Sequence, residues 1–301
     1  MITRDLETFR KRFAELEPNR PATCSAALLL APVGFSVSTE SAIDNHYLDL
    51  DQPADSDLAL RQHHGLADVI RGNGVPVISF DSRSDTPDAV FPNNVFGTIE
   101  GRAIIGRMCH PGRRKEAERA DIRQFFDQFL RYQMIDLSQQ DLVAELTGPL
   151  IIDRARGVGF CGMSDRVDEA GARAMHEAFK LKLTLCFDLA PGEYHSNVVM
   201  AVLAGRACVV HRDSIANPAV VDLMADLYPT LEIDDEEKAG FVGNCISVTP
   251  SEVYMSARAD SSLQPISREF FTDHGFRVVS ADVSELERAG GSLRCMVCEI
   301  Y

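Results

Sequence analysis

The feature that most constrains the fold is a pattern that recurs along the chain. Two apolar runs separated by a turn are followed by an amphipathic stretch and then by another apolar run. This order is typical of a β-hairpin followed by a helix and a strand. Successive hairpins begin about fifty residues apart, a period found in propeller-like repeats. The antiparallel hairpins disfavour the alternative, an open and purely parallel sheet.

The pattern predicts the following elements. Hairpins are expected at residues 89–108, 150–163, 197–210 and 244–257, with turns near residues 100–101, 156–157 and 204–206 in the first three. Helices are expected at 114–132, 166–180, 218–227 and 263–274, each followed by a strand at 133–137, 183–189, 231–233 and 276–280.

The two ends of the chain supply a fifth unit. Residues 26–30 read as a strand, 57–71 as a helix ending at a Gly-Asn-Gly cap, and 75–80 as the next strand. The strand that follows Gly290 and Gly291 and carries Cys295 can pair with residues 26–30 and close a ring. The sequence therefore predicts an α/β protein of five hairpin-helix-strand units, forming one domain over residues 1–301.

Composition excludes several classes of protein. The formal net charge is −15, and the one basic cluster, Arg113-Arg-Lys115, is followed at once by Glu116, so nucleic acid is not an expected partner. No apolar run approaches a membrane span or a signal peptide, and the eight cysteines lack the spacing of a disulfide scaffold or a zinc site. We expect a cytoplasmic protein without metal or cofactor; the sequence allows a homodimer.

Cys295 lies where a loop runs into a short apolar strand, a position that suits a nucleophile. Taken alone, a cysteine there is more often a buried thiol. In a ring of repeats, however, residues at the start of each hairpin point to one central site. Those residues are Asp88, Asn93, Asn94, Glu145, Asp153, His195, Asn197, Asn244 and Cys295. A thiol, an imidazole and carboxylates that converge form the set that covalent catalysis needs.

Several blocks of the chain resemble one known family. They are Asp88-Ala-Val-Phe-Pro-Asn-Asn94, Glu145-Leu-Thr-Gly148, Tyr194-His-Ser-Asn197, Met255-Ser-Ala-Arg258 and Gly290-Gly-Ser-Leu-Arg-Cys295. In this order they look like the signature of the guanidino-group modifying superfamily, which includes amidinotransferases, arginine deiminases and dimethylargininases. The closest similarity is to its citrulline-hydrolase branch. The resemblance implies the pentein fold, a five-bladed ββαβ propeller, in agreement with the repeat.

The resemblance also implies roles for single residues. Cys295 would be the nucleophile, His195 the general acid and base, and Glu145 a carboxylate that grips a substrate nitrogen. The other implied substrate-binding residues are Asp88 for the same group, Arg166 and more weakly Arg113 for the α-carboxylate, and Asn93, Asn94 and Asn197. The activity implied is cleavage of a C–N bond through a covalent cysteine intermediate.

Departures from the family pattern bear on the substrate, an arginine or citrulline derivative. Arginine-handling relatives commonly carry acidic residues where this chain has Asn93 and Asn94, and neutral amides suit a neutral ureido group. We therefore expect citrulline to be converted to ornithine. Leu146 stands where relatives usually carry glycine. Arginine deiminase, dimethylargininase and amidinotransferase activity remain open.

Two readings from other classes are weaker. A binding protein of the same fold is disfavoured by the intact Cys, His and Glu set. A redox role for Cys295 and Cys298 lacks the βαβ context of a thioredoxin-like motif, and Cys298 is expected to be buried in the strand.

Overall fold

The computed structural model describes residues 1–38, 40, 43–49, 51 and 53–301. These residues form five sheets with a common plan. In each sheet an antiparallel pair of strands is extended by a third strand that runs parallel to one member of the pair. The predicted succession of hairpin, crossover and parallel strand is confirmed.

The strands of the five sheets, in spatial order, are as follows. The first sheet has β16 (Cys298–Ile300), β2 (Ala26–Ala31) and β3 (Val77–Asp81); the second has β4 (Phe96–Ile99), β5 (Arg102–Ile105) and β6 (Gln133–Asp136). The third has β1 (Ile2–Thr3), β9 (Leu183–Asp188), β8 (Val158–Met163) and β7 (Leu150–Asp153). The fourth has β10 (Met200–Leu203), β11 (Ala207–Val210) and β12 (Thr230–Glu232), and the fifth has β13 (Ile246–Thr249), β14 (Glu252–Ser256) and β15 (Arg277–Ala281).

Glycines set two of the hairpin turns at the predicted places. Gly101 and Gly157 have φ angles of 71° and 70°, in the left-handed region where a side chain is strained. Each follows the first strand of its hairpin, so the chain can reverse and keep the antiparallel register.

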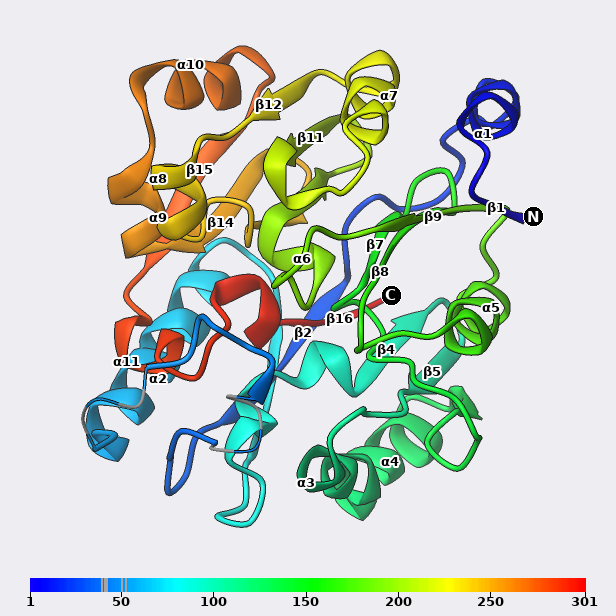
Figure 1. Ribbon diagram of the computed structural model, residues 1–301. Coiled ribbons are helices and arrows are strands. Elements are labelled where there is room, and N and C mark those ends of the chain that lie inside the picture. The colour runs from blue at the N-terminus through cyan, green and yellow to red at the C-terminus, as the bar shows by residue number, and fades with distance from the viewer. Residues whose placement is uncertain (39, 41–42, 50, 52) are drawn as a thin grey trace.

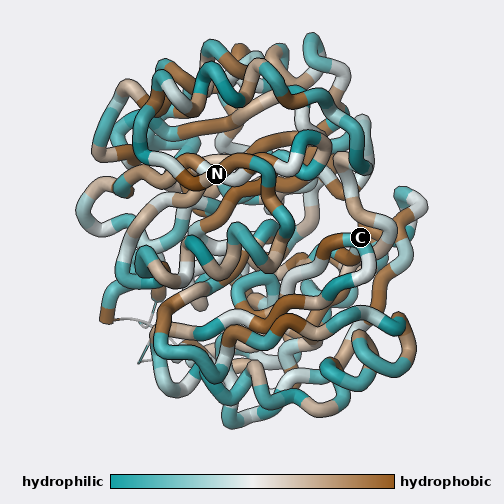
Figure 2. Tube along the Cα trace, turned by 90° about the vertical axis from the view of Figure 1, so that its right-hand side faces the viewer, coloured by the Kyte–Doolittle hydropathy of each residue, from teal (hydrophilic) through white to brown (hydrophobic). Residues whose placement is uncertain are grey.

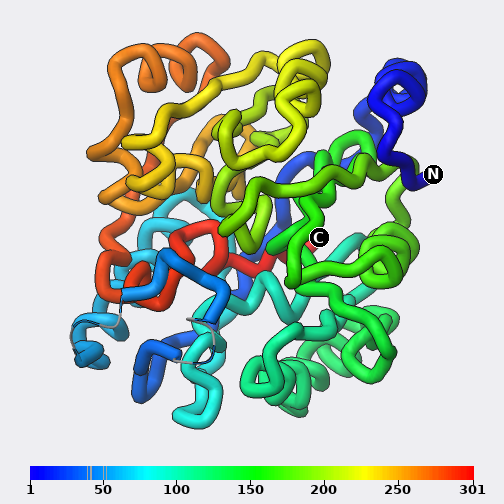
Figure 3. The backbone as a smooth tube through the Cα atoms, viewed as in Figure 1, coloured from blue at the N-terminus to red at the C-terminus, as the bar shows by residue number. Residues whose placement is uncertain are grey.

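The first sheet joins the two ends of the chain. β16 pairs antiparallel with β2, with Cys298 opposite Leu28, and β2 pairs parallel with β3. Figure 1 shows β16 and β2 side by side near the middle of the molecule, and the red end of the tube in Figure 3 runs into the same region. The predicted pairing of the last strand with residues 26–30 is therefore confirmed.

The crossover helices lie toward the outside of the molecule, whereas α6 (Ser196–Val199) lies near its middle (Figure 1). The crossover helices are α2 (Ser56–Gly72), α5 (Glu169–Ala178), α7 (Ala219–Leu227) and α10 (Pro265–Asp273). The others are α1 (Leu6–Phe13), α3 (Pro111–Arg114), α4 (Ala120–Gln124), α6 (Ser196–Val199), α8 (Asp235–Ala239), α9 (Ala257–Ser262) and α11 (Ser284–Glu287). Within the described residues, no helix combines the length and the apolar character that crossing a membrane requires.

Two sequence predictions need correction. The single helix expected at 114–132 is instead α3, a 3-10 turn, α4 and a π-helical turn at Phe125–Phe129, because Arg119 has extended backbone angles (φ −60°, ψ 96°). Cys295 does not lie on the last strand. It lies on a 3-10 turn, Leu293–Met296, that immediately precedes β16.

Hydrophobic side chains are buried between the strands and the outer helices, as the brown strands inside the teal periphery of Figure 2 indicate. Neighbouring sheets also touch: β4 contacts β16, and β10 contacts both β7 and β13. The inner strands of these neighbouring units thus pack against one another.

The difference in burial between two isoleucines predicts that their truncation changes the free energy of unfolding by very different amounts. Ile104 in β5 is fully buried, whereas Ile266 in α10 is 71% exposed. We expect Ile104→Ala to lower the free energy of unfolding by about 2–5 kcal/mol, because it removes buried methylenes and leaves a cavity. Ile266→Ala should change it by less than about 0.5 kcal/mol. Urea unfolding followed by circular dichroism measures both; equal losses would contradict the described packing.

Candidate active site

Cys295 is buried and lines a small pocket. Its side chain is only 2% exposed, and its sulfur receives a hydrogen bond from Asn244 Nδ2 at 3.2 Å. Asn197 Oδ1 lies 3.6 Å from the same sulfur. Asn244 also accepts a hydrogen bond from the backbone N–H of Arg294 at 3.0 Å, so it fixes the turn as well as the thiol.

The pocket around this thiol has polar and aromatic walls. It is lined by Asn45, Asp88, Phe91, Asn94, Arg113, Arg166, Tyr194, Ala289, Gly291 and Cys295. Its volume of about 20 Å³ is enough for about one water molecule. The pocket is therefore too small for a molecule of amino-acid size unless some of these walls move.

His195 and Glu145 form a buried pair beside the pocket. His195 Nε2 lies 2.8 Å from Glu145 Oε2, and both side chains are fully buried. The other ring nitrogen, His195 Nδ1, has no hydrogen-bond partner among the described residues. Because a neutral imidazole carries one proton, donation from Nε2 to Glu145 leaves Nδ1 as the basic nitrogen.

Glu145 has three protein partners. Besides His195, its carboxylate accepts from the backbone N–H of Cys109 at 3.0 Å and forms an ion pair with Arg166 at 3.2 Å. Its neighbour Leu146 has a φ of 34°, in the left-handed region that favours glycine. The glycine usual in relatives at this position suits the backbone better than leucine does.

Burial and neighbouring charges shift the pKa values of Glu145, His195 and Cys295 in different directions. Burial alone would raise the pKa of the Glu145 carboxyl, but Arg166 and His195 outweigh burial and hold that pKa well below its usual range. Burial lowers the pKa of His195, an effect that Glu145 offsets only in part. Burial raises the pKa of the Cys295 thiol despite the Asn244 hydrogen bond. At neutral pH the site thus holds a carboxylate, a neutral imidazole and a neutral thiol.

The predicted cationic residues are already engaged. Arg166 donates to Asp44 from Nε at 2.8 Å and from Nη2 at 2.6 Å, and its remaining Nη1 faces Glu145. Arg113 donates to both oxygens of Glu116 at 3.0 Å and to backbone carbonyls of Asp88 and Phe91. Both guanidinium groups line the pocket.

The predicted amides divide into two groups. Asn94 lines the pocket, and its Oδ1 has no hydrogen-bond partner among the described residues. Asn93 is buried against Thr147, to which its Nδ2 donates at 3.3 Å, and is absent from the pocket lining. Asn197 donates to the carbonyl of Thr147 at 3.1 Å. The assignment of substrate-binding roles to these residues stays a prediction.

Sequence reasoning missed a loop that covers the site. Asp44 clamps Arg166, Asn45 lines the pocket, and Tyr47 donates to Glu193 at 2.8 Å. Their segment, 43–49, has neither helical nor strand periodicity. Asn244 appeared in the hairpin register without a role, and no sequence pattern distinguished its contact with the thiol. Among the residues described, no cluster of three or more His, Cys, Asp or Glu suits a metal ion.

The fold, the buried thiol and the His-Glu pair together define a guanidino-group modifying enzyme of the pentein type, as the resemblance implied. More narrowly, the chain belongs to the family described as N,N dimethylarginine dimethylhydrolase, eukaryotic, whose sequence profile matches residues 31–301. It is therefore a hydrolase that acts on C–N bonds of guanidino-type groups, which confirms the predicted enzyme class.

Relatives in sequence are distant. The uncharacterized protein YkgA of Bacillus subtilis (strain 168) is 25% identical over 236 residues, covering 78% of this chain and 77% of its own. The uncharacterized protein ZK1307.1 of Caenorhabditis elegans is 18% identical, covering 82% of this chain and 85% of its own.

Solved structures share the fold. A mutant N-terminal domain of ArgZ bound to substrate, an arginine dihydrolase from the ornithine-ammonia cycle in cyanobacteria, has a TM-score of 0.80 at 17% identity, covering 91% of this chain and 97% of its own. The adduct of a dimethylarginine dimethylaminohydrolase mutant with S-methyl-L-thiocitrulline has a TM-score of 0.73 at 22% identity. The match covers 92% of this chain and 100% of that chain.

Close packing under His195 predicts the effect of a single methyl group. A Cβ on Gly148 would lie 2.6 Å from His195 Nε2, so Gly148→Ala has to displace the imidazole. We expect kcat/KM to fall by about 10–100-fold, since an error of about 1 Å in a catalytic group costs rate on this scale. Gly65→Ala, at a helical position with open space around it, is the matched control and should leave kcat/KM unchanged. Equal activities in the two variants would show that His195 is not constrained from this side.

The raised pKa of Cys295 predicts slow alkylation at neutral pH. The rate of labelling with iodoacetamide should rise with pH, with an inflection above the ordinary thiol value of about 8.5, because only the thiolate reacts. Asn244→Ala should shift this inflection upward and slow labelling several-fold at a fixed pH, since it removes the donor to the sulfur. Asn19→Ala, in an exposed segment, is the control. Mass spectrometry of the labelled peptide separates Cys295 from Cys298, whose pKa burial raises to about 12.

Proposed function

We propose that the protein is a thiol-dependent hydrolase that cleaves a C–N bond at the ureido carbon of citrulline, or of a closely similar arginine derivative. With citrulline the product is ornithine. The observation that carries this proposal is the pocket itself. One buried thiol, held by two asparagines, shares the pocket with the Asp88 carboxylate and the Asn94 amide, next to the His195–Glu145 pair.

Asn94 supports a neutral substrate. An asparagine can accept from a ureido N–H through Oδ1 or donate to a ureido oxygen through Nδ2, whereas a carboxylate would favour a cationic guanidinium. The Asn94 Oδ1 is buried and has no protein partner among the described residues, so a ligand N–H would satisfy it. Asn93 contributes indirectly, by fixing Thr147 at the edge of the site.

The first half of the reaction needs a base for the thiol. His195 Nδ1, the nitrogen that does not face Glu145, takes the proton from Cys295, which gives a thiolate and an imidazolium. The thiolate adds to the ureido carbon. The imidazolium then returns the proton to the departing Nδ of the substrate, the C–N bond breaks, and ornithine leaves an S-carbamoyl cysteine.

The second half restores the enzyme. His195, again neutral, takes a proton from a water molecule that attacks the carbamoyl carbon. The C–S bond then breaks, and the imidazolium returns the proton to the departing thiolate, which gives the free thiol and carbamic acid; the acid ionises to carbamate. Glu145 stabilises the imidazolium in both halves, because it stays ionised across the physiological pH range. The contact with His195 supports a positioning role for Glu145, and the grip on a substrate nitrogen expected from the sequence stays a prediction.

Two of the remaining polar residues bind different groups of the substrate. Asp88 accepts from the terminal ureido amide, and Arg166 binds the α-carboxylate once it gives up part of its contact with Asp44. Arg113, tied to Glu116, keeps its charge in the wall of the pocket. Dimethylarginine hydrolysis is the second candidate, because it is the activity in the description of the matching family.

We further propose that the five sheets close into a five-bladed ring that forms one domain. The contacts of β16 with β4, of β7 with β10 and of β10 with β13 support this arrangement. Arg154 bridges the second and third sheets by donating to the carbonyl of Thr98 at 2.8 Å, and β14 contacts the turn that precedes β16. Small-angle scattering that required an elongated, open particle would overturn it.

The substrate assignment predicts a clear product pattern. Purified protein incubated separately with citrulline, arginine and asymmetric dimethylarginine should release ornithine from citrulline at least about tenfold faster than it turns over the others. Cys295→Ala should abolish turnover, since no group replaces the nucleophile. Turnover that survives in this variant would refute the mechanism.

Asn94→Asp tests the basis of the preference. A carboxylate in this buried position should lower kcat/KM for citrulline by about tenfold or more. It should also raise the ratio of kcat/KM for arginine to that for citrulline, because a carboxylate favours a cation. Asn217→Asp, an exposed position, is the matched control and should leave both values unchanged. Identical ratios in wild type and Asn94→Asp would show that Asn94 does not read the charge of the substrate.

A further inference from the structure

A second pocket, larger than the site around Cys295, opens beside the end of the last strand. It has a volume of about 520 Å³ and is lined by Arg20, Pro21, Thr23, Cys24, Ser25, Ile99, Glu100, Ile152, Arg154, Gly157, Phe179, Lys180, Leu181 and Tyr301. None of these residues lines the pocket of Cys295. We call it the Arg154 pocket.

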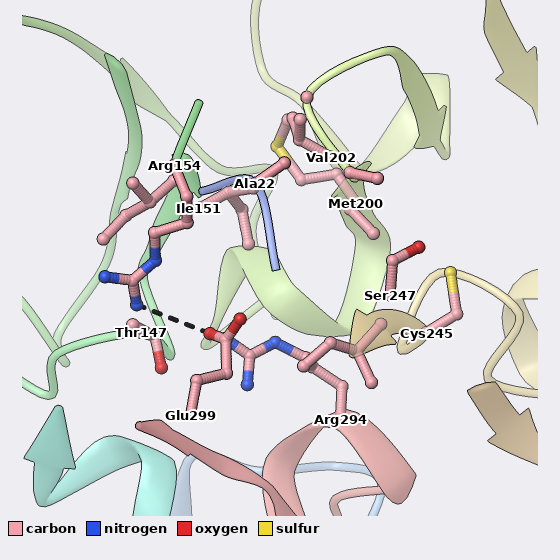
Figure 4. Close-up of a pocket in the computed structure, with 15 residues that line it drawn as sticks. Ala22, Thr147, Ile151, Arg154, Met200, Val202, Cys245, Ser247, Arg294 and Glu299 are labelled. Carbon is pink, nitrogen blue, oxygen red and sulfur yellow. Dashed lines mark hydrogen bonds and ion pairs between the residues drawn. The ribbon is translucent and has the colours of Figure 1, made fainter. Parts of the chain in front are cut away.

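Arg154 lies in the wall between the Arg154 pocket and a small adjoining cavity, which is lined by Arg294 and Glu299. Arg154 Nη2 lies 3.4 Å from Glu299 Oε2, and Arg294 Nη2 lies 3.2 Å from the same oxygen. Figure 4 shows both guanidinium groups directed at this one carboxylate, seen from the small adjoining cavity that Arg154 separates from the Arg154 pocket. Two buried cations thus share one buried anion.

The rim adds two further cations. Arg20 and Lys180 line the pocket, and neither forms an ion pair with a carboxylate among the described residues. Arg20 instead donates to the backbone carbonyl of Lys180 at 3.4 Å. Glu100 is the one acidic side chain in the lining, so the pocket is cationic in a chain of net charge −15. A local reversal of sign in an acidic protein concentrates anions.

The rest of the lining is apolar and aromatic. The Arg154 guanidinium lies 4.4 Å from the centre of the Tyr301 ring and 5.3 Å from that of Phe179. Ile99, Ile152 and Leu181 complete this wall. A bare inorganic anion would leave the apolar wall in contact with water, whereas an aromatic group attached to the anion would cover it.

We propose that the Arg154 pocket binds a small organic anion, in which a carboxylate, sulfonate or phosphate is attached to a flat apolar group. The acidic group would lie between Arg20 and Lys180, and the apolar group against Tyr301 and Leu181. This site is separate from the proposed catalysis and does not depend on it.

Fluorescence titration with 8-anilinonaphthalene-1-sulfonate tests the proposal, because this probe is an aromatic anion. We expect saturable binding with one probe per chain. Arg20→Ala combined with Lys180→Ala should raise the Kd by about tenfold or more, equivalent to about 1.4 kcal/mol. The neutral probe N-phenyl-1-naphthylamine should lose less than about twofold in affinity with the same double variant.

Arg61→Ala combined with Lys11→Ala is the matched control, since it removes the same charges from exposed helix positions outside the pocket. If both double variants weaken the anionic probe equally, net charge accounts for binding and the proposal is wrong. Displacement of the probe by benzoate supports the proposal. If inorganic phosphate displaces the probe and benzoate does not, the proposed contact of an apolar group with Tyr301 and Leu181 is wrong. Absence of saturable binding to the wild type also overturns the proposal. Turnover by the Arg20 and Lys180 variant, measured alongside, reports independently on the active site.

Discussion

One buried carboxylate, that of Glu145, organises the catalytic side of the molecule. It accepts from the backbone of Cys109, from His195 and from Arg166, and so connects three separate segments at one point. A buried anion is costly unless it is fully paired, and each partner here compensates part of that cost. Removing any of the three would leave charge uncompensated inside the protein. The position of the imidazole, and through Arg166 that of the covering loop, therefore follows from a single electrostatic requirement.

A second carboxylate, that of Asp44, also pairs with Arg166 and attaches the loop 43–49 to the site. Asp44, on the loop 43–49, supplies the second carboxylate to Arg166, while His110 contacts Asp44 at 3.0 Å. Burial alone would raise the pKa of Asp44, yet Arg166 and His110 lower it, so the clamp stays charged at neutral pH. Arg166 therefore joins the loop 43–49 to the buried carboxylate of Glu145.

Much of the fold could be predicted because its determinants are local. Turn glycines such as Gly101, the alternating apolar runs and the fifty-residue period all act within a few neighbours. Burial of His195 and Glu145 side by side followed from their equivalent places in the repeat. The break at Arg119 and the 3-10 turn under Cys295 could not be predicted, since tertiary packing sets them against the local propensity. The contact of Asp44 with Arg166 joins residues 122 positions apart, and Asp44 lies in an irregular segment that has no periodic signal.

The pairing of β16 with β2 has a consequence for biosynthesis. Cys298 leaves the ribosome about 270 residues after its strand partner Leu28. At synthesis rates of about 5–20 residues per second, the edge of β2 waits for tens of seconds before its neighbour exists. The turn that carries Cys295 is therefore made only after the strands of the other four sheets, and a chain that stopped before β16 would leave this edge of β2 unpaired.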